Sequence, residues 1–195
     1  MQQQYDARGR AALLALTLSR IPLALVLIAM FLIREPGATE IVVGTVLLVL
    51  IELSDFLDGQ LARRRNLISE LGATLDPYAD SVARFLTYFA LAEGGLALML
   101  VPVCMALRDI TVAYSRIIVV RAGRSASAKI SGKLKAGVQA AGAFVLLMGP
   151  LYWRFTGEGI MPVLSYIIGV LTLVSGVEYV VGALRIVSTD HDASS

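Results

Sequence analysis

The chain has 195 residues, of which 57% are hydrophobic and only 16% are charged, and its mean hydropathy is +0.75. This is more apolar surface than a soluble domain of that length can bury around one core, so the composition favours a membrane protein. The basic residues behind the net charge of +2 mostly flank or enter apolar runs, which fits anionic lipid or phosphate better than nucleic acid.

Two residue types that often carry chemistry occur only once each. Cys104 lies in an apolar run and is interpreted as a small buried hydrophobe, whereas His191 lies in a polar tail. The sequence therefore predicts no disulfide framework, no cysteine-rich metal site and no histidine catalysis.

Six apolar segments follow one another along the chain, each close to the roughly 20 residues that cross a bilayer. The N-terminal residues run into the first segment without a small-residue cleavage site, so we expect an anchored helix rather than a removed signal peptide. No long linker or internal repeat separates the segments. The sequence predicts an all-α, polytopic membrane protein with one domain over 1–195, a six-helix bundle with spans at about 11–33, 38–58, 69–92, 95–119, 133–153 and 160–185.

Basic residues are distributed unevenly between the two ends of these segments. Arg34 and Arg154 lie at one end, whereas the other end holds the basic residues at 8, 10, 63–65, 121, 124, 129, 133, 135 and 185. Cytoplasmic loops of inner or plasma membrane proteins retain Lys and Arg. Both termini, and the aspartate-rich ends of the second and third segments, are therefore predicted to be cytoplasmic.

Four aspartates lie at the charged ends of the second and third segments. Asp55 and Asp58 are three residues apart, and Asp76 and Asp80 are four apart, so on helices each pair projects from one face. Four carboxylates at membrane depth repel one another and require a cation. Carboxylate oxygens without thiolate or imidazole favour hard ions, so we expect Mg²⁺ or Mn²⁺, and two such ions can clamp a phosphate in an in-line displacement.

Glycine, arginine and proline surround these aspartates. Gly59 and Gly72 remove side chains where a ligand or a neighbouring helix must approach closely. Arg63 lies one turn beyond Gly59 and can bind phosphate oxygens, whereas the two arginines after it fit the excess of cytoplasmic positive charge. Pro77 predicts a kink or a break in the third helix.

The complete pattern DxxDGxxARx(8)GxxxDxxxD is met at Asp55, Asp58, Gly59, Ala62, Arg63, Gly72, Asp76 and Asp80. It resembles the signature of the CDP-alcohol phosphotransferase family. The resemblance implies a six-helix membrane enzyme, usually a homodimer, that uses a CDP-linked donor and divalent metal ions. It implies that Asp55, Asp58 and Asp76 are metal ligands and that Asp80 is both a ligand and the general base. By the same resemblance, the CDP site is formed by Asp58, Gly59, Ala62, Arg63 and Gly72.

Looser similarity extends to the phosphatidylglycerophosphate synthases of that family. LTLSR at 16–20, TLDPYAD at 74–80, LRDI at 107–110 and SGKLKAGVQ at 131–139 resemble segments of those synthases. The sequence departs from them at Leu14, where they commonly carry asparagine, at Ser81, where they carry lysine, and at Ala136, where threonine is usual. The resemblance implies transfer of a phosphatidyl group from CDP-diacylglycerol to the hydroxyl of glycerol 3-phosphate, with release of CMP.

An acceptor that carries its own phosphate requires cations in addition to the metal ions. The predicted acceptor site consists of Arg108, Arg116, Lys129, Lys133 and Lys135. Arg108 and Arg116 fall at membrane depth, where an unpaired charge costs at least about 2.5 kcal/mol, and Asp109 is a candidate to neutralise one of them. The three lysines fit equally well a basic cluster that faces anionic headgroups.

Other interpretations stay open at the sequence level. Inositol phosphate or serine as acceptor would need the same chemistry, although a cationic pocket argues against serine, which has no phosphate. Outside the family, intramembrane aspartates and arginines suit an ion or proton transporter, and an inactive bundle could serve as a scaffold. Glu52, one turn before Asp55, either extends the polar patch or pairs with Arg84.

Overall fold

The computed structural model describes residues 2–64, 70–123, 130–157 and 159–192, and every regular element in that part of the chain is a helix. The all-α class predicted from the sequence is therefore confirmed for these residues. The helices are α1 (Gln2–Ile33), α2 (Ala38–Arg64), α3 (Glu70–Glu93), α4 (Leu100–Arg121), α5 (Ile130–Leu147), α6 (Gly149–Thr156) and α7 (Ile160–Asp192).

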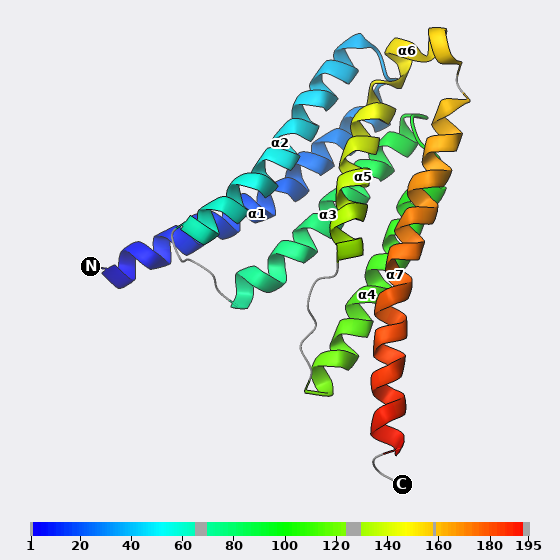
Figure 1. Ribbon diagram of the computed structural model, residues 1–195. Coiled ribbons are helices and arrows are strands. Elements are labelled where there is room, and N and C mark those ends of the chain that lie inside the picture. Colours follow the sequence, from blue (N-terminus) through cyan, green and yellow to red (C-terminus); the bar gives the residue numbers. More distant parts are fainter. Residues whose placement is uncertain (1, 65–69, 124–129, 158, 193–195) are drawn as a thin grey trace.

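The long helices run alternately up and down the molecule (Figure 1). α1 packs along α3 and α2, α4 packs along α7, and α5 contacts α2, α3 and α7. The short helix α6 lies at the upper end in this view and leads from α5 to α7. Because the direction alternates, the last turns of α2 and α4 lie toward the same end as the first turns of α3 and α5. This arrangement brings the charged ends of α2 and α3 together.

The largest buried cluster joins side chains from α1, α2, α3, α4, α5 and α7, together with the turn before α4. Close approach of α5 to α7 is possible at Gly142, where an added Cβ would lie 2.5 Å from Cδ1 of Ile168. Polar bonds cross the same layer: the Tyr88 hydroxyl donates to the Gln139 carbonyl (2.6 Å), and Nε2 of Gln139 donates to the Thr172 hydroxyl (2.7 Å). These contacts fix α5 against both α3 and α7.

Large apolar side chains cover much of the outer surface. On α4 and α7 they include Val103, Leu107, Ile110, Ile117, Val163, Ile167, Val170, Val174 and Val177, all exposed. A helix that is apolar on its outward face as well as its inward face is typical of a lipid environment. By length and composition, Ala11–Ile33 and Ile160–Arg185 are sufficient to cross a membrane, and Lys135–Leu147 is apolar but shorter. The other four predicted spans stay predictions.

Two of the predicted spans are not helical throughout. The span predicted at 133–153 is divided, because α5 ends at Leu147 and α6 begins at Gly149. Pro150, in the first turn of α6, has no amide hydrogen to continue the ladder of α5. The span predicted to begin at residue 95 begins as a helix only at Leu100, since the chain turns through Gly95 with φ of +68°.

Pro77 does not break the third helix. It lies inside α3, which is continuous from Glu70 to Glu93. A proline in a helix removes one bond to the carbonyl four residues earlier, and the bonds on either side keep the helix intact here. Asp76 and Asp80 therefore project from a single helix, one turn apart.

Candidate active site

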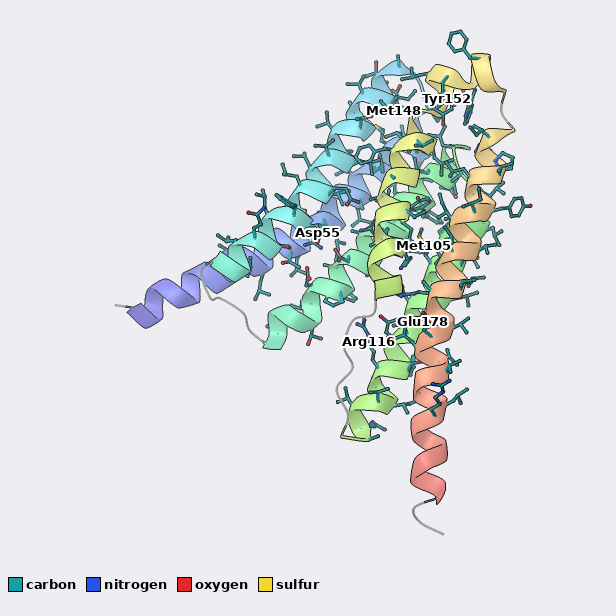
Figure 2. The ribbon with its side chains drawn as sticks, in the orientation of Figure 1. Asp55, Met105, Arg116, Met148, Tyr152 and Glu178 are labelled. Carbon is teal, nitrogen blue, oxygen red and sulfur yellow. The ribbon has the colours of Figure 1, made fainter. Side chains whose placement is uncertain are left out.

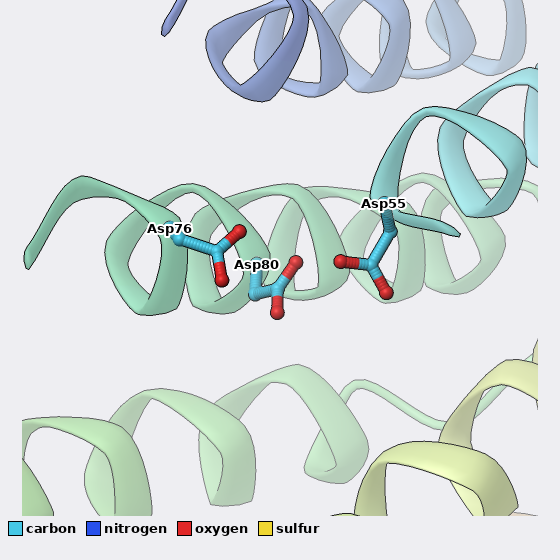
Figure 3. A group of neighbouring side chains, drawn as sticks. All are labelled: Asp55, Asp76 and Asp80. Carbon is cyan, nitrogen blue, oxygen red and sulfur yellow. The ribbon is translucent and has the colours of Figure 1, made fainter. Parts of the chain in front are cut away.

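Three of the predicted carboxylates meet between α2 and α3. Asp55 of α2 points toward Asp76 and Asp80 of α3 in Figure 3, and each offers an oxygen within 4.8 Å of the other two. The two α3 residues share a face because they are four residues apart, and packing brings Asp55 to them. The three side chains are 35–49% exposed, so the group is open to the surroundings.

Asp58 lies beside this group but is buried, with only 5% of its side chain exposed. Its Oδ2 accepts hydrogen bonds from the Thr17 hydroxyl (2.9 Å) and from Nη2 of Arg20, both on α1. The four predicted ligands thus form an open group of three and a buried fourth, which are connected through Arg20. We call the four together the aspartate cluster.

Arg20, the last residue of the LTLSR segment, lies in the site although the aspartate pattern does not include it. Its side chain is 1% exposed and contacts all four members of the aspartate cluster: Nη1 contacts Asp80 and lies 3.2 Å from Oδ1 of Asp55, and Nη2 contacts Asp58 and lies 3.3 Å from Oδ1 of Asp76. One signal in the sequence could have found it, because an arginine in the middle of an apolar span needs a partner at membrane depth.

The inner side of the site is closed by an ion pair. Nη1 of Arg84 lies 3.6 Å from Oε1 of Glu52 and donates to the Ala136 carbonyl of α5 (3.0 Å), so Glu52 does pair with Arg84. A cavity of about 20 Å³ between these groups and Asp80 has room for about one water molecule. It is far too small for a nucleotide or a phosphorylated alcohol. The side of the cluster that is open is the one where Asp55, Asp76 and Asp80 are exposed.

The donor set of the open group fits a divalent cation. Asp55, Asp76 and Asp80 supply only carboxylate oxygens, which are the ligands that Mg²⁺ and Mn²⁺ prefer, and the distances among these oxygens allow one ion to be shared. Because Arg20 contacts the same three side chains, a divalent cation and the guanidinium would share these carboxylates.

Two of the predicted acceptor residues form a buried ion network on α4 and α5. Asp109 accepts from Nη1 of Arg108 (2.7 Å) and from Nζ of Lys135 (3.2 Å), so it neutralises part of this charge, as expected from the sequence. Nε of Arg108 also donates to the Ser175 hydroxyl of α7 (3.2 Å). Gly176 leaves space for the Arg108 side chain, since an added Cβ would lie 3.1 Å from its Cγ.

Arg116, one of the labelled residues in Figure 2, lies two turns further along α4. Arg108 and Arg116 both lie over the ring of Tyr179 on α7, with 5.5 and 5.4 Å from each guanidinium carbon to the ring centroid. Nε of Arg116 is buried and has no hydrogen-bond partner in the part of the chain that is described. A cation held this way has donors available for an anionic ligand.

The remaining predicted residues are only partly covered. Gly59 lies on α2 and Gly72 in the first turn of α3, both half-buried. Ala62 and Arg63 belong to α2 and Lys133 to α5, but their side chains lie outside the described residues, as does the whole of Lys129.

Fold and site together define a helical membrane protein with a partly open carboxylate cluster suited to a divalent cation and a separate buried basic cluster. Residues 14–178 match the sequence profile of the CDP-alcohol phosphatidyltransferases, and the chain belongs to that family. The family assignment makes it a membrane-bound transferase of phospholipid biosynthesis, which favours the enzyme over the transporter interpretation. Members of the family use CDP-diacylglycerol and an alcohol acceptor and generally use a divalent metal ion.

Several relatives match this chain over most of its length. This chain is 34% identical over 188 residues to a probable phosphatidylglycerophosphate synthase of Mycobacterium tuberculosis. The alignment covers 93% of this chain and 87% of the relative. The chain is 27% identical over 176 residues to the CDP-diacylglycerol–glycerol-3-phosphate 3-phosphatidyltransferase of Bacillus subtilis, covering 84% and 90%. A protein of the same name from Rickettsia typhi is 28% identical over 178 residues, covering 84% and 92%.

Proposed function

We propose that this protein transfers the phosphatidyl group of CDP-diacylglycerol to the hydroxyl of glycerol 3-phosphate, giving phosphatidylglycerophosphate and CMP. The observation that carries this proposal is the meeting of Asp55, Asp76 and Asp80 on the open side of α2 and α3, in a chain of this family. The names of the relatives from Bacillus and Mycobacterium support glycerol 3-phosphate as the acceptor.

In this proposal the aspartate cluster holds Mg²⁺ or Mn²⁺, with Asp55, Asp58, Asp76 and Asp80 as ligands. One or two such ions, when bound, would neutralise the diphosphate and the charge that develops on departing CMP. Asp80 accepts the proton of the acceptor hydroxyl. The freed oxygen attacks the phosphorus on the lipid side of the diphosphate, and the bond from that phosphorus to the CMP oxygen breaks.

We assign the CDP part of the donor to the ends of α2 and α3 nearest the cluster. Asp58, Gly59, Ala62, Arg63 and Gly72 form this site in the proposal. The half-buried glycines support it, because a residue without a side chain lets a ligand approach the backbone closely. Arg63 would bind phosphate oxygens through its planar guanidinium.

We assign the phosphate of the acceptor to the basic cluster on α4 and α5, formed by Arg108, Arg116, Lys129, Lys133 and Lys135. Asp109 already balances part of the charge of Arg108 and Lys135. Arg116 has no carboxylate partner in the described part of the chain, so its charge is the one best placed to be balanced by a bound phosphate. Arg84 bonds to the carbonyl next to Lys135 and thereby connects this cluster to the region of Asp80.

The proposed setting is a bundle of six membrane spans in one domain, with both termini and the site on the cytoplasmic side, working as a homodimer. The alternating helices and the basic residues at one end support this orientation. At that surface a lipid donor and a water-soluble acceptor can both reach the aspartate cluster.

A direct test is to give the purified protein CDP-diacylglycerol and Mg²⁺, add glycerol 3-phosphate, inositol phosphate or serine separately, and measure CMP release. We expect turnover with glycerol 3-phosphate alone and none after chelation by EDTA. Turnover with serine alone would contradict the proposed acceptor.

The same assay tests Asp80. Because a general base contributes about 10²–10⁴-fold to the rate, D80N should lose turnover by that factor. Circular dichroism should still show a helical protein with a cooperative melting transition, so that the loss is not due to unfolding. The matched control is S81A, the neighbouring change without a charge. Unchanged turnover in D80N would remove Asp80 from this role.

A further inference from the structure

Arg20 is the most heavily partnered charge among the described residues. One guanidinium from α1 contacts four carboxylates, one pair on α2 and one pair on α3. It is also the largest of the fully buried side chains. The aspartate pattern does not include it, and the LTLSR segment that ends at Arg20 gives it no role, yet it contacts every member of the aspartate cluster.

The contacts of Arg20 are made almost entirely by its terminal nitrogens. Nη1 and Nη2 are shared among the carboxylates, whereas Nε is buried without a hydrogen-bond partner in the described part of the chain. The described structure shows no carbonyl or hydroxyl that anchors the guanidinium from behind. Among the described residues, carboxylates alone bond to the guanidinium, so another cation that takes up those oxygens would weaken its attachment.

Charge balance leads to the same point. Four carboxylates that meet at one place repel one another, and one arginine balances at most one of four negative charges. The guanidinium of Arg20 lies among the four carboxylates and offsets part of their mutual repulsion. It also places a positive charge where a divalent cation would bind and occupies oxygens of the same side chains, Asp55, Asp76 and Asp80.

We propose that Arg20 is a positioning residue that acts as the internal counter-ion of the metal site: it holds the four aspartates together before divalent cations bind, and it competes with those cations for the carboxylates. The inference rests on the metal site of the proposed function. It extends that function because a residue of α1, which supplies none of the four aspartates, would determine how tightly the site binds the metal ion.

The test uses two measurements on the full-length protein without substrate. Electron paramagnetic resonance measures the affinity for Mn²⁺, and thermal unfolding in EDTA measures the melting temperature of the metal-free protein. R20M keeps the length of the side chain and removes its charge. We expect R20M to bind Mn²⁺ at least about tenfold more tightly, because a cation beside the ion is removed. We also expect it to melt at a lower temperature than the wild type in EDTA and to gain more stability from Mn²⁺.

Two control variants separate this role from a general effect of charge or packing. R20K keeps a cation at the same place and should restore affinity and melting temperature toward the wild type. R34M removes one positive charge from an exposed position paired with Glu40, and it should bind Mn²⁺ as the wild type does. If R20M does not survive purification, R20Q replaces it, with the same tightening expected.

Mn²⁺ binding by R20M equal to or weaker than that of the wild type would overturn the role of Arg20 while leaving the metal site intact. Absence of Mn²⁺ binding by the wild type would instead overturn the metal site of the proposed function, and the role of Arg20 with it. A purely structural arginine would lower the melting temperature of R20M without tightening the binding of Mn²⁺.

Discussion

Arg116 gives a prediction at the scale of a single residue. If its free donors bind the phosphate of the acceptor, R116M should raise KM for glycerol 3-phosphate by roughly tenfold or more, because a hydrogen bond to a charged group contributes about 1.5–3 kcal/mol. KM for CDP-diacylglycerol should not change. Initial rates of CMP release at varied concentrations of each substrate measure both quantities.

The matched control is R121M, which removes an exposed arginine from the end of the same helix. It should leave both KM values near those of the wild type. Equal KM values for glycerol 3-phosphate in R116M and the wild type would place the acceptor phosphate elsewhere.

The residues of the site were predictable to different degrees. Asp76 and Asp80 could be paired from helical spacing. Asp109 was expected to neutralise either Arg108 or Arg116, and the structure pairs it with Arg108. The contacts of Arg20 could not be derived from spacing, because its partners Asp58 and Asp80 lie 38 and 60 residues away. Spacing identifies residues on one face of one helix, whereas packing decides which other helix faces them.

At the scale of the helix, α5 supplies a pair of glycines with opposite expectations. An added Cβ at Gly142 would lie 2.5 Å from Ile168 and 2.9 Å from the Tyr88 hydroxyl, whereas none of the surrounding atoms lies within 4 Å of a Cβ at Gly137. G142A should therefore destabilise the protein by about 1–3 kcal/mol through overpacking. G137A should leave stability unchanged or raise it by up to about 1 kcal/mol, since alanine favours helices.

Thermal unfolding in detergent, followed by circular dichroism, distinguishes the two glycine variants. A melting temperature of G142A equal to that of G137A would show that α5 and α7 do not approach as closely as described.

Helix positions were predicted better than helix ends. Apolar length located both ends of α3 to within one residue, and it located the end of α1 and the starts of α2 and α7. The start of α1 and the ends of α2 and α7 run six to nine residues further into polar sequence than the predicted spans. The division between α5 and α6 was missed because a hydropathy average spreads Gly149 and Pro150 over the apolar residues on either side of them. Mean hydropathy indicates whether a segment can lie in lipid, but it does not show whether the helix is interrupted within that segment.

At the scale of the whole molecule, the proposed orientation predicts which ends face the cytoplasm. In a C104A background, E35C should react with a membrane-impermeant maleimide in intact spheroplasts, and R121C should react only after permeabilisation. Both positions are exposed, and they lie at opposite ends of the alternating helices. A difference in their labelling would therefore report the side of the membrane and not the burial of the cysteine. The reverse pattern would invert the topology and put the aspartate cluster on the outer face.

Composition and charge indicated a helical membrane protein, and the aspartate pattern indicated its family, both of which hold. The number of spans stays a prediction because α2, α3 and α4 carry charged residues within their length, which hydropathy counts against them. The same charged residues form the aspartate cluster and the basic cluster. The helices that contain the site are therefore the ones whose membrane spans are hardest to predict from hydropathy.

The position of Arg20 also has a consequence for how the protein is made. The ribosome synthesises α1 before α2 and α3, so Arg20 exists before its partners Asp58 and Asp80, which lie 38 and 60 residues later in the chain. An arginine alone in the middle of a membrane helix costs about 2.5–3.5 kcal/mol on insertion scales. Stable integration of α1 should therefore wait for α2 and α3, so that the first three helices leave the translocation machinery as one unit.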